Sequence, residues 1–384
     1  MNSKRKQENN ESLPWKRKQE NNDESMAECV LPQDMIDCII TRLPVKSIYR
    51  FKSVCKPLRQ VFSSPKFVKM HRAHFPQNQS VVIYSRTVEY INNISLLKIK
   101  PDEEKIPSKL DIPFPQVKDL ADLVGCCNGL LCMSFPCEFV ALWNPALNNA
   151  FKCIPIPDLE TEGPHMLSIG FGYNEEEDDF KVIIIAELEK DVKVRVEVYS
   201  ANSDSWSTID VGFQFSVFPS KNSAIVNGSP YWVAEVDEKL VLVCFDVRKM
   251  VLKIVPLSYL IYEGAIDTLF VDFKGDLGAL VSKQKKGETV LSLEMWVFDD
   301  VGKNGWTKKL SFRPIELKVH RFLQCLENGK TLIGECLEDG KVFVFDTENG
   351  DVKEIVIGEA ERGSFQVYGY TESLAYIKGM EVLV

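Results

Sequence analysis

The feature that most limits how this chain can fold is a strand–turn–strand unit that recurs along its C-terminal part. In each unit an apolar strand ends in Asn, Asp or Ser, a turn follows, and a second strand begins. The units lie around five aromatic residues, Trp143, Tyr199, Phe245, Phe298 and Phe345. Their spacing of roughly 45 to 55 residues is typical of the blade period of a β-propeller.

Further hairpins lie between these units, in the stretches "SAIVNGSPYWVAEV", "LFVDFKGDLGALVS" and "LQCLENGKTLIGEC". Two hairpins give four strands, which make one blade. Five blades can be counted between about Asn128 and Ile357, and two strand-like pieces, 81–99 and 365–377, remain. Unpaired strand edges promote aggregation, so we predict that the two pieces pair as a sixth, composite blade. In it, 365–377 supplies inner strands and 81–99 outer strands.

The stretch from Leu31 to about Phe75 has helical rather than strand periodicity. "LPQDMIDCIITRLP" predicts a helix that begins at Pro32 and ends at Pro44, and a second helix follows from about Val45 to Val54. Pro57 suits the first turn of a third helix. Three short helices bury too little surface to be comfortably stable alone, so their apolar stripe must be covered by something else.

The first 28 residues contain a near-duplicate, "KRKQENNES" and "KRKQENNDES". The segment is charged and almost without apolar residues, which predicts a disordered tail. Its basic clusters, Lys4–Arg5 and Lys16–Lys18, are spaced like a two-part nuclear import signal. The alternative is a duplicated tail that only adds solubility. We expect the protein in the nucleus and cytoplasm.

Charge and hydropathy exclude several classes of partner. The net charge of −9 argues against general binding to nucleic acid or to acidic membranes, because phosphate binding needs an excess of Lys and Arg. No apolar run approaches the roughly 18 residues of a membrane helix. The N-terminal "MNSKRKQENN" also lacks the apolar stretch of a signal peptide, so we place the protein inside the cell.

The cysteines predict neither disulfides nor a zinc site. There are 11, scattered and mostly within apolar runs, as expected for reduced core residues. A cluster of four, Cys126, Cys127, Cys132 and Cys137, lacks the paired spacing and the nearby His of a zinc site. We therefore predict buried thiols and no metal.

Catalytic chemistry finds little support either. The acidic stretch "NEEEDD" at 174–179 lies between two predicted strands, which indicates a solvated hairpin turn rather than a calcium loop. His165 and His320 are too few for a base-rich or redox-metal site. The pair His71 and His74 we expect at an exposed helix end. No cofactor is predicted.

Two regions resemble a known family. "LPQDMIDCIITRLPVKSIYRFKSVCKPLRQVFSSPKFVKMH" resembles the F-box of plant F-box proteins along nearly its whole length. "LVGCCNGLLCM", "LWNPALNNAFKCIPIP" and "SIGFGYNEEEDDFKVI" resemble the F-box-associated interaction domain of the same family. The resemblance implies a small all-α three-helix F-box module followed by an all-β, kelch-like propeller. The domains would be a 1–28 tail, a 29–75 F-box and a 76–384 substrate-binding propeller.

The resemblance also implies a function. The chain would be a non-catalytic substrate-recognition subunit of an SCF-type cullin–RING ubiquitin ligase, docking on a Skp-type adaptor and, through it, on cullin and RING subunits. This is the helix-in-groove mode of recognition. Ten residues would share between internal core and adaptor contact: Leu31, Pro32, Ile36, Ile39, Ile40, Leu43, Pro44, Ile48, Val54 and Cys55. Leu58 replaces the Trp that is frequent in the family, which removes aromatic area from this interface.

The target protein is not named by the sequence. Propellers bind through loops at one rim or at the mouth of the channel, so the candidate turns are those near Gly163, Ser203, Asp237, Lys286 and Asn304. The alternative to a ligase subunit is a propeller enzyme, or a stand-alone binding scaffold whose helices pack only internally.

Overall fold

The computed structural model falls into two compact units, residues 1–77 and 78–384. The residues it describes are 32–74, 80–89, 91–99, 106–113, 121–135, 138–158, 166–188, 193–218, 224–284, 290–299, 305–312, 314–316, 318–326, 329–358 and 360–382. Within these ranges, no helix combines the length and the apolar character needed to cross a membrane.

The first unit contains four short helices: α1 (Gln33–Ile40), α2 (Val45–Phe51), α3 (Lys56–Phe62) and α4 (Pro65–His74). The three predicted helices are confirmed, although α2 ends at Phe51 instead of near Val54. Pro32 and Pro44 immediately precede α1 and α2, and Pro57 lies in the first turn of α3. The fourth helix was not predicted. It is capped by Ser64, whose Oγ accepts a hydrogen bond from Phe67 N at 3.2 Å.

The helices close around a small core. Val45, Ile48, Phe62 and Phe67 are buried, and the rings of Phe62 and Phe67 lie 5.0 Å apart. His71 is buried as well, and its Nε2 donates to the carbonyl oxygen of Leu43 at 2.9 Å. The expectation of an exposed histidine at this position is therefore wrong. The imidazole joins α4 to the segment between α1 and α2. Burial lowers the pKa of His71, which favours the neutral ring.

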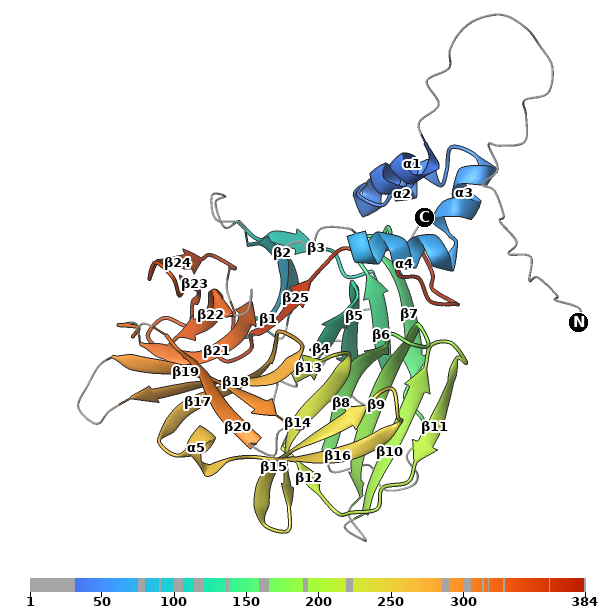
Figure 1. The fold of residues 1–384 in the computed structure, drawn as a ribbon. Coiled ribbons are helices and arrows are strands. Elements are labelled where there is room, and N and C mark those ends of the chain that lie inside the picture. Colours follow the sequence, from blue (N-terminus) through green and yellow to red (C-terminus); the bar gives the residue numbers. More distant parts are fainter. Residues whose placement is uncertain are drawn as a thin grey trace, which may run out of the picture. The chain divides into compact units, whose positions relative to one another are not determined.

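The second unit is a six-bladed propeller, and Figure 1 shows its sheets arranged around a common centre. Each blade is an antiparallel sheet of four strands, and in one blade the first strand is split in two. The first two blades are β4 (Asp122–Cys127), β5 (Leu130–Phe135), β6 (Phe139–Asn144), β7 (Ala150–Pro155), and β8 (Met166–Asn174), β9 (Asp179–Leu188), β10 (Lys193–Ser200), β11 (Ser205–Ile209).

The next three blades continue in chain order, with a short helix α5 (Tyr259–Tyr262) before the second of them. Their strands are β12 (Ser216–Val217), β13 (Ala224–Val226), β14 (Ser229–Val236), β15 (Lys239–Asp246), β16 (Val251–Pro256); β17 (Ala265–Phe273), β18 (Asp276–Gln284), β19 (Leu291–Asp299), β20 (Gly305–Ser311); and β21 (Val319–Leu326), β22 (Thr331–Cys336), β23 (Val342–Asp346), β24 (Val352–Ile355).

The repeat seen in the sequence corresponds to one position in the blade. Trp143, Tyr199, Phe245, Phe298 and Phe345 all lie on the third strand of their blade, near the turn to the fourth. Four of the five are buried, and Phe298 is half-buried. The period therefore reflects one large aromatic side chain at the equivalent position of the third strand in each of these blades.

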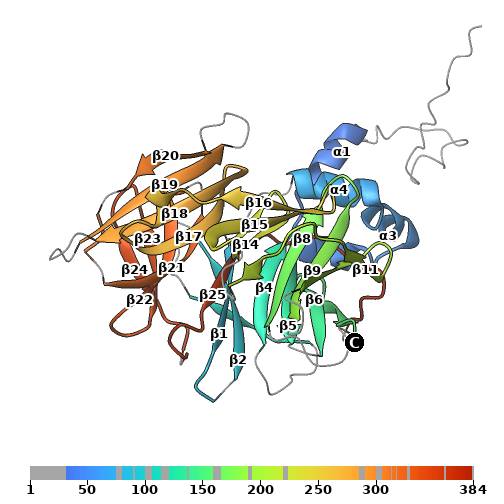
Figure 2. The same ribbon diagram turned by 90° about the horizontal axis from the view of Figure 1, so that it is seen from below.

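The sixth blade is composite, as predicted. Its strand order is β25 (Gln366–Tyr370), β1 (Ser80–Arg86), β2 (Asn92–Lys98) and β3 (Ser108–Leu110), with the C-terminal strand innermost. Figures 1 and 2 show β25, in red, beside β1 from the beginning of the propeller. The inner strand β25 also contacts β4 and β21, which closes the ring.

One part of that prediction is wrong, because the C-terminal piece supplies a single inner strand. Residues 371–382 instead run along the blade β4–β7. The Asn144 side chain donates to the carbonyl oxygens of Ser373 and Ala375, at 3.1 and 2.8 Å. Phe151 and Glu381 pair as an isolated bridge. We call residues 361–382 the C-terminal strap.

The propeller has two faces that differ in their connections. The hairpin face carries the turns between first and second and between third and fourth strands, among them 128–129, 175–178, 201–204, 227–228, 247–250 and 347–351. The interblade face carries the turns between second and third strands and the connections between blades, among them 210–215, 237–238, 257–264, 337–341 and 356–358. Successive strands of a blade run in opposite directions, so consecutive connections alternate between the two faces.

Glycines on β8 allow neighbouring blades to approach closely. A Cβ at Gly172 would lie 2.4 Å from the carbonyl oxygen of Gly228, which belongs to the next blade. That same oxygen accepts a hydrogen bond from Tyr173 N at 2.9 Å. Gly172, the second glycine in "SIGFGYN", is thus required by backbone-to-backbone packing, not by a special backbone angle.

We expect Gly172→Ala to destabilise the propeller by about 1–3 kcal/mol, the usual cost of overpacking a close-packed site. The contacting atom is backbone, so it cannot move aside as a flexible side chain would. The matched control is Gly212→Ala, where no atom lies within 4 Å of the added carbon. Thermal melting should show a lower Tm for Gly172→Ala alone; equal melting of the two variants would contradict this account of the packing.

Candidate functional site

The four-helix unit leaves apolar side chains in solvent. Met35 and Ile39, which lie one helical turn apart on α1, are 52% and 51% exposed. At the end of α2 and just after it, Phe51 is 40% and Val54 69% exposed. No described side chain of α1 is fully buried. This is the pattern of a helical face that a partner completes.

The structure divides the predicted adaptor-contact residues by burial. Ile48 belongs to the core, since it has no exposed surface. Ile36, Ile40 and Leu43 are half-buried. The exposed members are Pro32, Ile39, Pro44, Val54 and Cys55. Leu31 lies outside the described residues.

The prediction omitted two exposed residues, Met35 and Phe51. Both lie on the apolar faces that helical periodicity identifies, so the signal was present in the sequence. Leu58, which replaces the frequent Trp, is half-buried. We call Met35, Ile39, Phe51 and Val54 the exposed apolar set.

The helical unit that carries the exposed apolar set is rich in basic residues. Between residues 32 and 77 there are nine Lys and Arg against two Asp, although the whole chain has a net charge of −9. Lys46, Arg50, Lys56 and Arg59, on α2 and α3, are all exposed. A partner surface that covers these helices is therefore expected to be acidic.

The cysteine cluster lies in the first two strands of one blade. Cys127 and Cys132 are buried, and burial raises the pKa of both thiols well above the ordinary value. Burial also raises the pKa of Cys126 to about 12. These thiols are protonated and unreactive at neutral pH. Cys137 lies outside the described residues.

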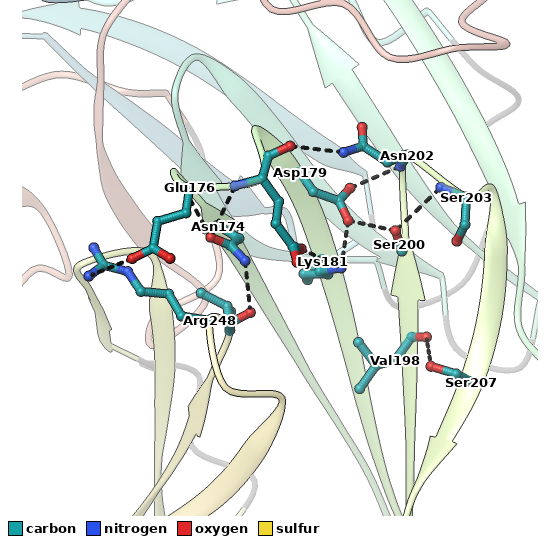
Figure 3. Close-up of polar contacts among 12 residues, drawn as sticks. Asn174, Glu176, Asp179, Lys181, Val198, Ser200, Asn202, Ser203, Ser207 and Arg248 are labelled. Carbon is teal, nitrogen blue, oxygen red and sulfur yellow. Dashed lines mark hydrogen bonds and ion pairs between the residues drawn. The ribbon is translucent and has the colours of Figure 1, made fainter. Parts of the chain in front are cut away.

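The acidic turn 174–179 is a hairpin tip on the hairpin face, as predicted (Figure 3). Its one buried carboxylate, Asp179, binds protein donors: Lys181 Nζ and Ser200 Oγ lie at 2.5 Å, and Asn202 N at 2.9 Å. Glu176 is exposed and lies 3.8 Å from Arg248 of the next blade. Asp179 thus braces the turn. Among the described residues, no group of three or more His, Cys, Asp or Glu is arranged to hold a metal ion.

The central channel contains a cavity of about 330 Å³, lined by the inner strands β4, β13, β17, β21 and β25. Its polar groups are engaged within the protein. Asp272 Oδ1 accepts from Gly275 N, and the Gln324 amide bonds to Cys325 N and to the Val367 carbonyl oxygen. Nothing in this lining resembles a set of catalytic groups.

The candidate target-binding turns separate onto the two faces. The turn at Ser203 joins β10 to β11 on the hairpin face, and the turn at Asp237 joins β14 to β15 on the interblade face. One target at a single rim cannot use both. The turns near Gly163, Lys286 and Asn304 lie outside the described residues.

Comparison with known proteins decides the family. Residues 29–70 match the F-box domain, and residues 78–377 match the F-box associated beta propeller domain. The chain is a plant F-box protein of this propeller family.

The relatives of this F-box protein agree with that assignment. It is 25% identical to an F-box/kelch-repeat protein of Arabidopsis thaliana over 303 residues, covering 73% of this chain and 79% of the relative. It is 26% identical to an F-box/WD-40 repeat-containing protein of the same species over 363 residues, covering 87% and 82%. A solved chain from a nidogen/laminin complex covers 76% of this chain and 97% of its own length at 11% identity, with a TM-score of 0.40, too low to support any conclusion.

Proposed function

We propose that this F-box protein is the substrate-recognition subunit of an SCF-type cullin–RING ubiquitin ligase. Its helices dock on a Skp-type adaptor, and its propeller holds the protein to be ubiquitinated. The observation that carries the proposal is the exposed apolar set, which leaves a small helical unit incomplete by itself. The excess of basic residues in the same helical unit favours an acidic adaptor surface.

The subunit is non-catalytic in this proposal. Ubiquitin transfer needs no group on this chain, because cullin and RING subunits join through the adaptor. The buried thiols of the cysteine cluster, with their raised pKa, are unsuited to form a thioester. The competing function of a propeller enzyme would need polar side chains that converge in the channel. In the described lining, Asp272 and Gln324 bond within the protein instead.

Co-expression with a Skp-type adaptor tests the proposal. We expect the two proteins to elute together from size exclusion as a one-to-one complex, and this complex to bind cullin. A monodisperse chain that elutes alone in the presence of excess adaptor would reject the ligase function and favour the stand-alone scaffold.

We also propose that the protein is present in both nucleus and cytoplasm, on the basis of the basic clusters in its tail. These clusters lie outside the described residues. Replacing five basic residues with Ala should shift a fluorescent fusion toward the cytoplasm: Lys4, Arg5, Lys16, Arg17 and Lys18. The matched control replaces five acidic residues of the same tail: Glu8, Glu11, Glu20, Asp23 and Glu24. An unchanged nuclear fraction in the basic variant would show that the tail only adds solubility.

A further inference from the structure

A patch of aromatic and aliphatic side chains lies exposed on the interblade face, where β16 connects to β17. Tyr259 and Tyr262 of α5 project into solvent with their rings 5.6 Å apart at nearly a right angle. Ile266 and Leu240 are also exposed. We call these four residues the α5 patch. Figure 1 shows α5 next to β17 at the edge of the propeller.

The fold holds this patch in a defined shape. Between the two tyrosines, Ile261 is buried in one cluster with Leu242, Ala279 and Trp306, which fixes α5 to the blades on either side. Trp306 Nε1 also donates to the carbonyl oxygen of Pro256 at 2.8 Å, just before the helix. The helix therefore presents both tyrosine rings outward from a rigid base.

A β-bulge adds Ile266 to the patch. The pairing of β17 with β18 shifts register between Ala265 and Asp267, which leaves Ile266 without a cross-strand partner. Its side chain is 51% exposed, directly after α5. Bulges re-aim single side chains and are frequent next to binding sites.

Carboxylates lie on the same face as the patch. Glu235, Asp237 and Glu238 at the β14–β15 turn are exposed, and none forms an ion pair with a described residue, whereas Lys239 is the single cation of that turn. Glu263 of the α5 connection accepts a hydrogen bond from the Tyr259 hydroxyl at 2.8 Å. The propeller as a whole has 47 Asp and Glu against 31 Lys and Arg between residues 78 and 384.

We infer that the α5 patch and its carboxylates form the docking surface for the target protein, and that the bound segment of the target is basic and carries apolar side chains. Exposed tyrosine rings beside carboxylates suit Lys and Arg, because the ring faces attract cations and the carboxylates pair with them. Ile266 and Leu240 supply apolar area for the rest of the segment. The inference rests on the proposed function only in calling the bound protein a ligase target.

Peptide selection on the immobilised full chain tests the inference. The probe is a phage-displayed library of random 16-residue peptides. Phages that bind to immobilised adaptor alone are removed first as background binders. We expect enriched peptides with net positive charge and at least one aromatic or aliphatic residue. A synthetic copy of an enriched peptide should bind the chain more weakly as the salt concentration rises. Enrichment of neutral or acidic peptides, or no enrichment over background, would overturn the inference.

Matched charge variants locate the binding surface. Glu235→Lys with Glu238→Lys should weaken binding of the synthetic peptide at least tenfold, and so should Tyr259→Ala with Tyr262→Ala. The control is Glu175→Lys with Asp351→Lys, which changes net charge equally but at exposed positions of the hairpin face. Equal losses in both charge variants would show a general field effect and reject the α5 patch.

Adaptor binding, measured separately on the same protein preparations, keeps the two proposals distinct. The propeller variants should bind adaptor like the wild type. Loss of adaptor binding with peptide selection intact would remove the ligase function and leave the docking surface. Adaptor binding without selection of basic peptides would do the reverse.

Discussion

A chain that ends at Arg362 is expected to aggregate, or to melt far below the full-length protein. The 363–384 deletion removes β25 and most of the C-terminal strap, so the composite blade loses its inner strand. The edge of β1, from Ser80 to Tyr84, then has no partner on that side. Unpaired edges of this length recruit other chains.

The energetic reason lies in what the deleted segment buries. It carries seven apolar side chains with at most 6% exposure: Phe365, Val367, Tyr370, Leu374, Ala375, Ile377 and Met380. Losing one large buried side chain costs about 2–5 kcal/mol, whereas a whole domain is stable by only about 5–15 kcal/mol. The loss therefore exceeds the stability of the propeller.

The deletion also removes hydrogen-bond partners from a buried ion pair. Arg321 Nε lies 3.0 Å from Glu335 Oε2, and its Nη2 donates to the carbonyl oxygens of Gly363 and Phe365 at 2.8 Å. Glu335, which has no exposed surface, accepts in turn from Gly363 N at 2.7 Å. Removing these partners leaves buried polar groups unsatisfied, which adds to the cost.

Light scattering and thermal melting check the expectation. The control chain ends at Val382 and keeps β25 and the strap, so it should remain monomeric with the Tm of the full-length protein. A monodisperse monomer with unchanged Tm after deletion from Gly363 would contradict the composite blade as the closure of the ring.

Local patterns predicted most of this fold. Period-two strands and Asn, Asp or Gly turns identified the third and fourth strands of each complete blade, because both signals depend on neighbours in the sequence. The composite blade followed from a different argument, the cost of an open edge. The prediction of inner strands as far as Ile377 was wrong because the contacts of residues 371–382 with Asn144 and Phe151 span more than 200 residues and leave no periodic trace.

The sites were less accessible to sequence reasoning. Ile39 and Ile48 look equivalent as apolar residues at helical spacing, yet one is half exposed and the other entirely buried. The difference depends on which side of each helix packs inside the helical unit, which spacing does not encode. The α5 patch was not predicted either, because the exposure of Tyr259 and Tyr262 depends on how Ile261 is anchored, and that of Ile266 on a local bulge.

Replacing Ile39 and Val54 with Asp should reduce affinity for the Skp-type adaptor at least 100-fold. Both side chains are exposed in the free chain, so the change leaves the helical core intact. In the complex, each loses about 1.5–3 kcal/mol of apolar burial. A desolvated, unpaired carboxylate costs more still. Together these terms exceed the roughly 2.7 kcal/mol that correspond to a 100-fold loss in affinity.

Two comparisons separate interface from fold in this experiment. Val88→Asp with Val356→Asp places the same charges at exposed apolar positions of the propeller and should leave adaptor affinity unchanged. Ile48→Ala removes a core residue, so its weaker binding should be accompanied by loss of helical circular dichroism. Isothermal titration should therefore show a large affinity loss with preserved helicity for the Ile39 and Val54 variant alone. Wild-type affinity in that variant would show that the adaptor binds elsewhere, because two new carboxylates cannot be buried in an apolar groove without cost.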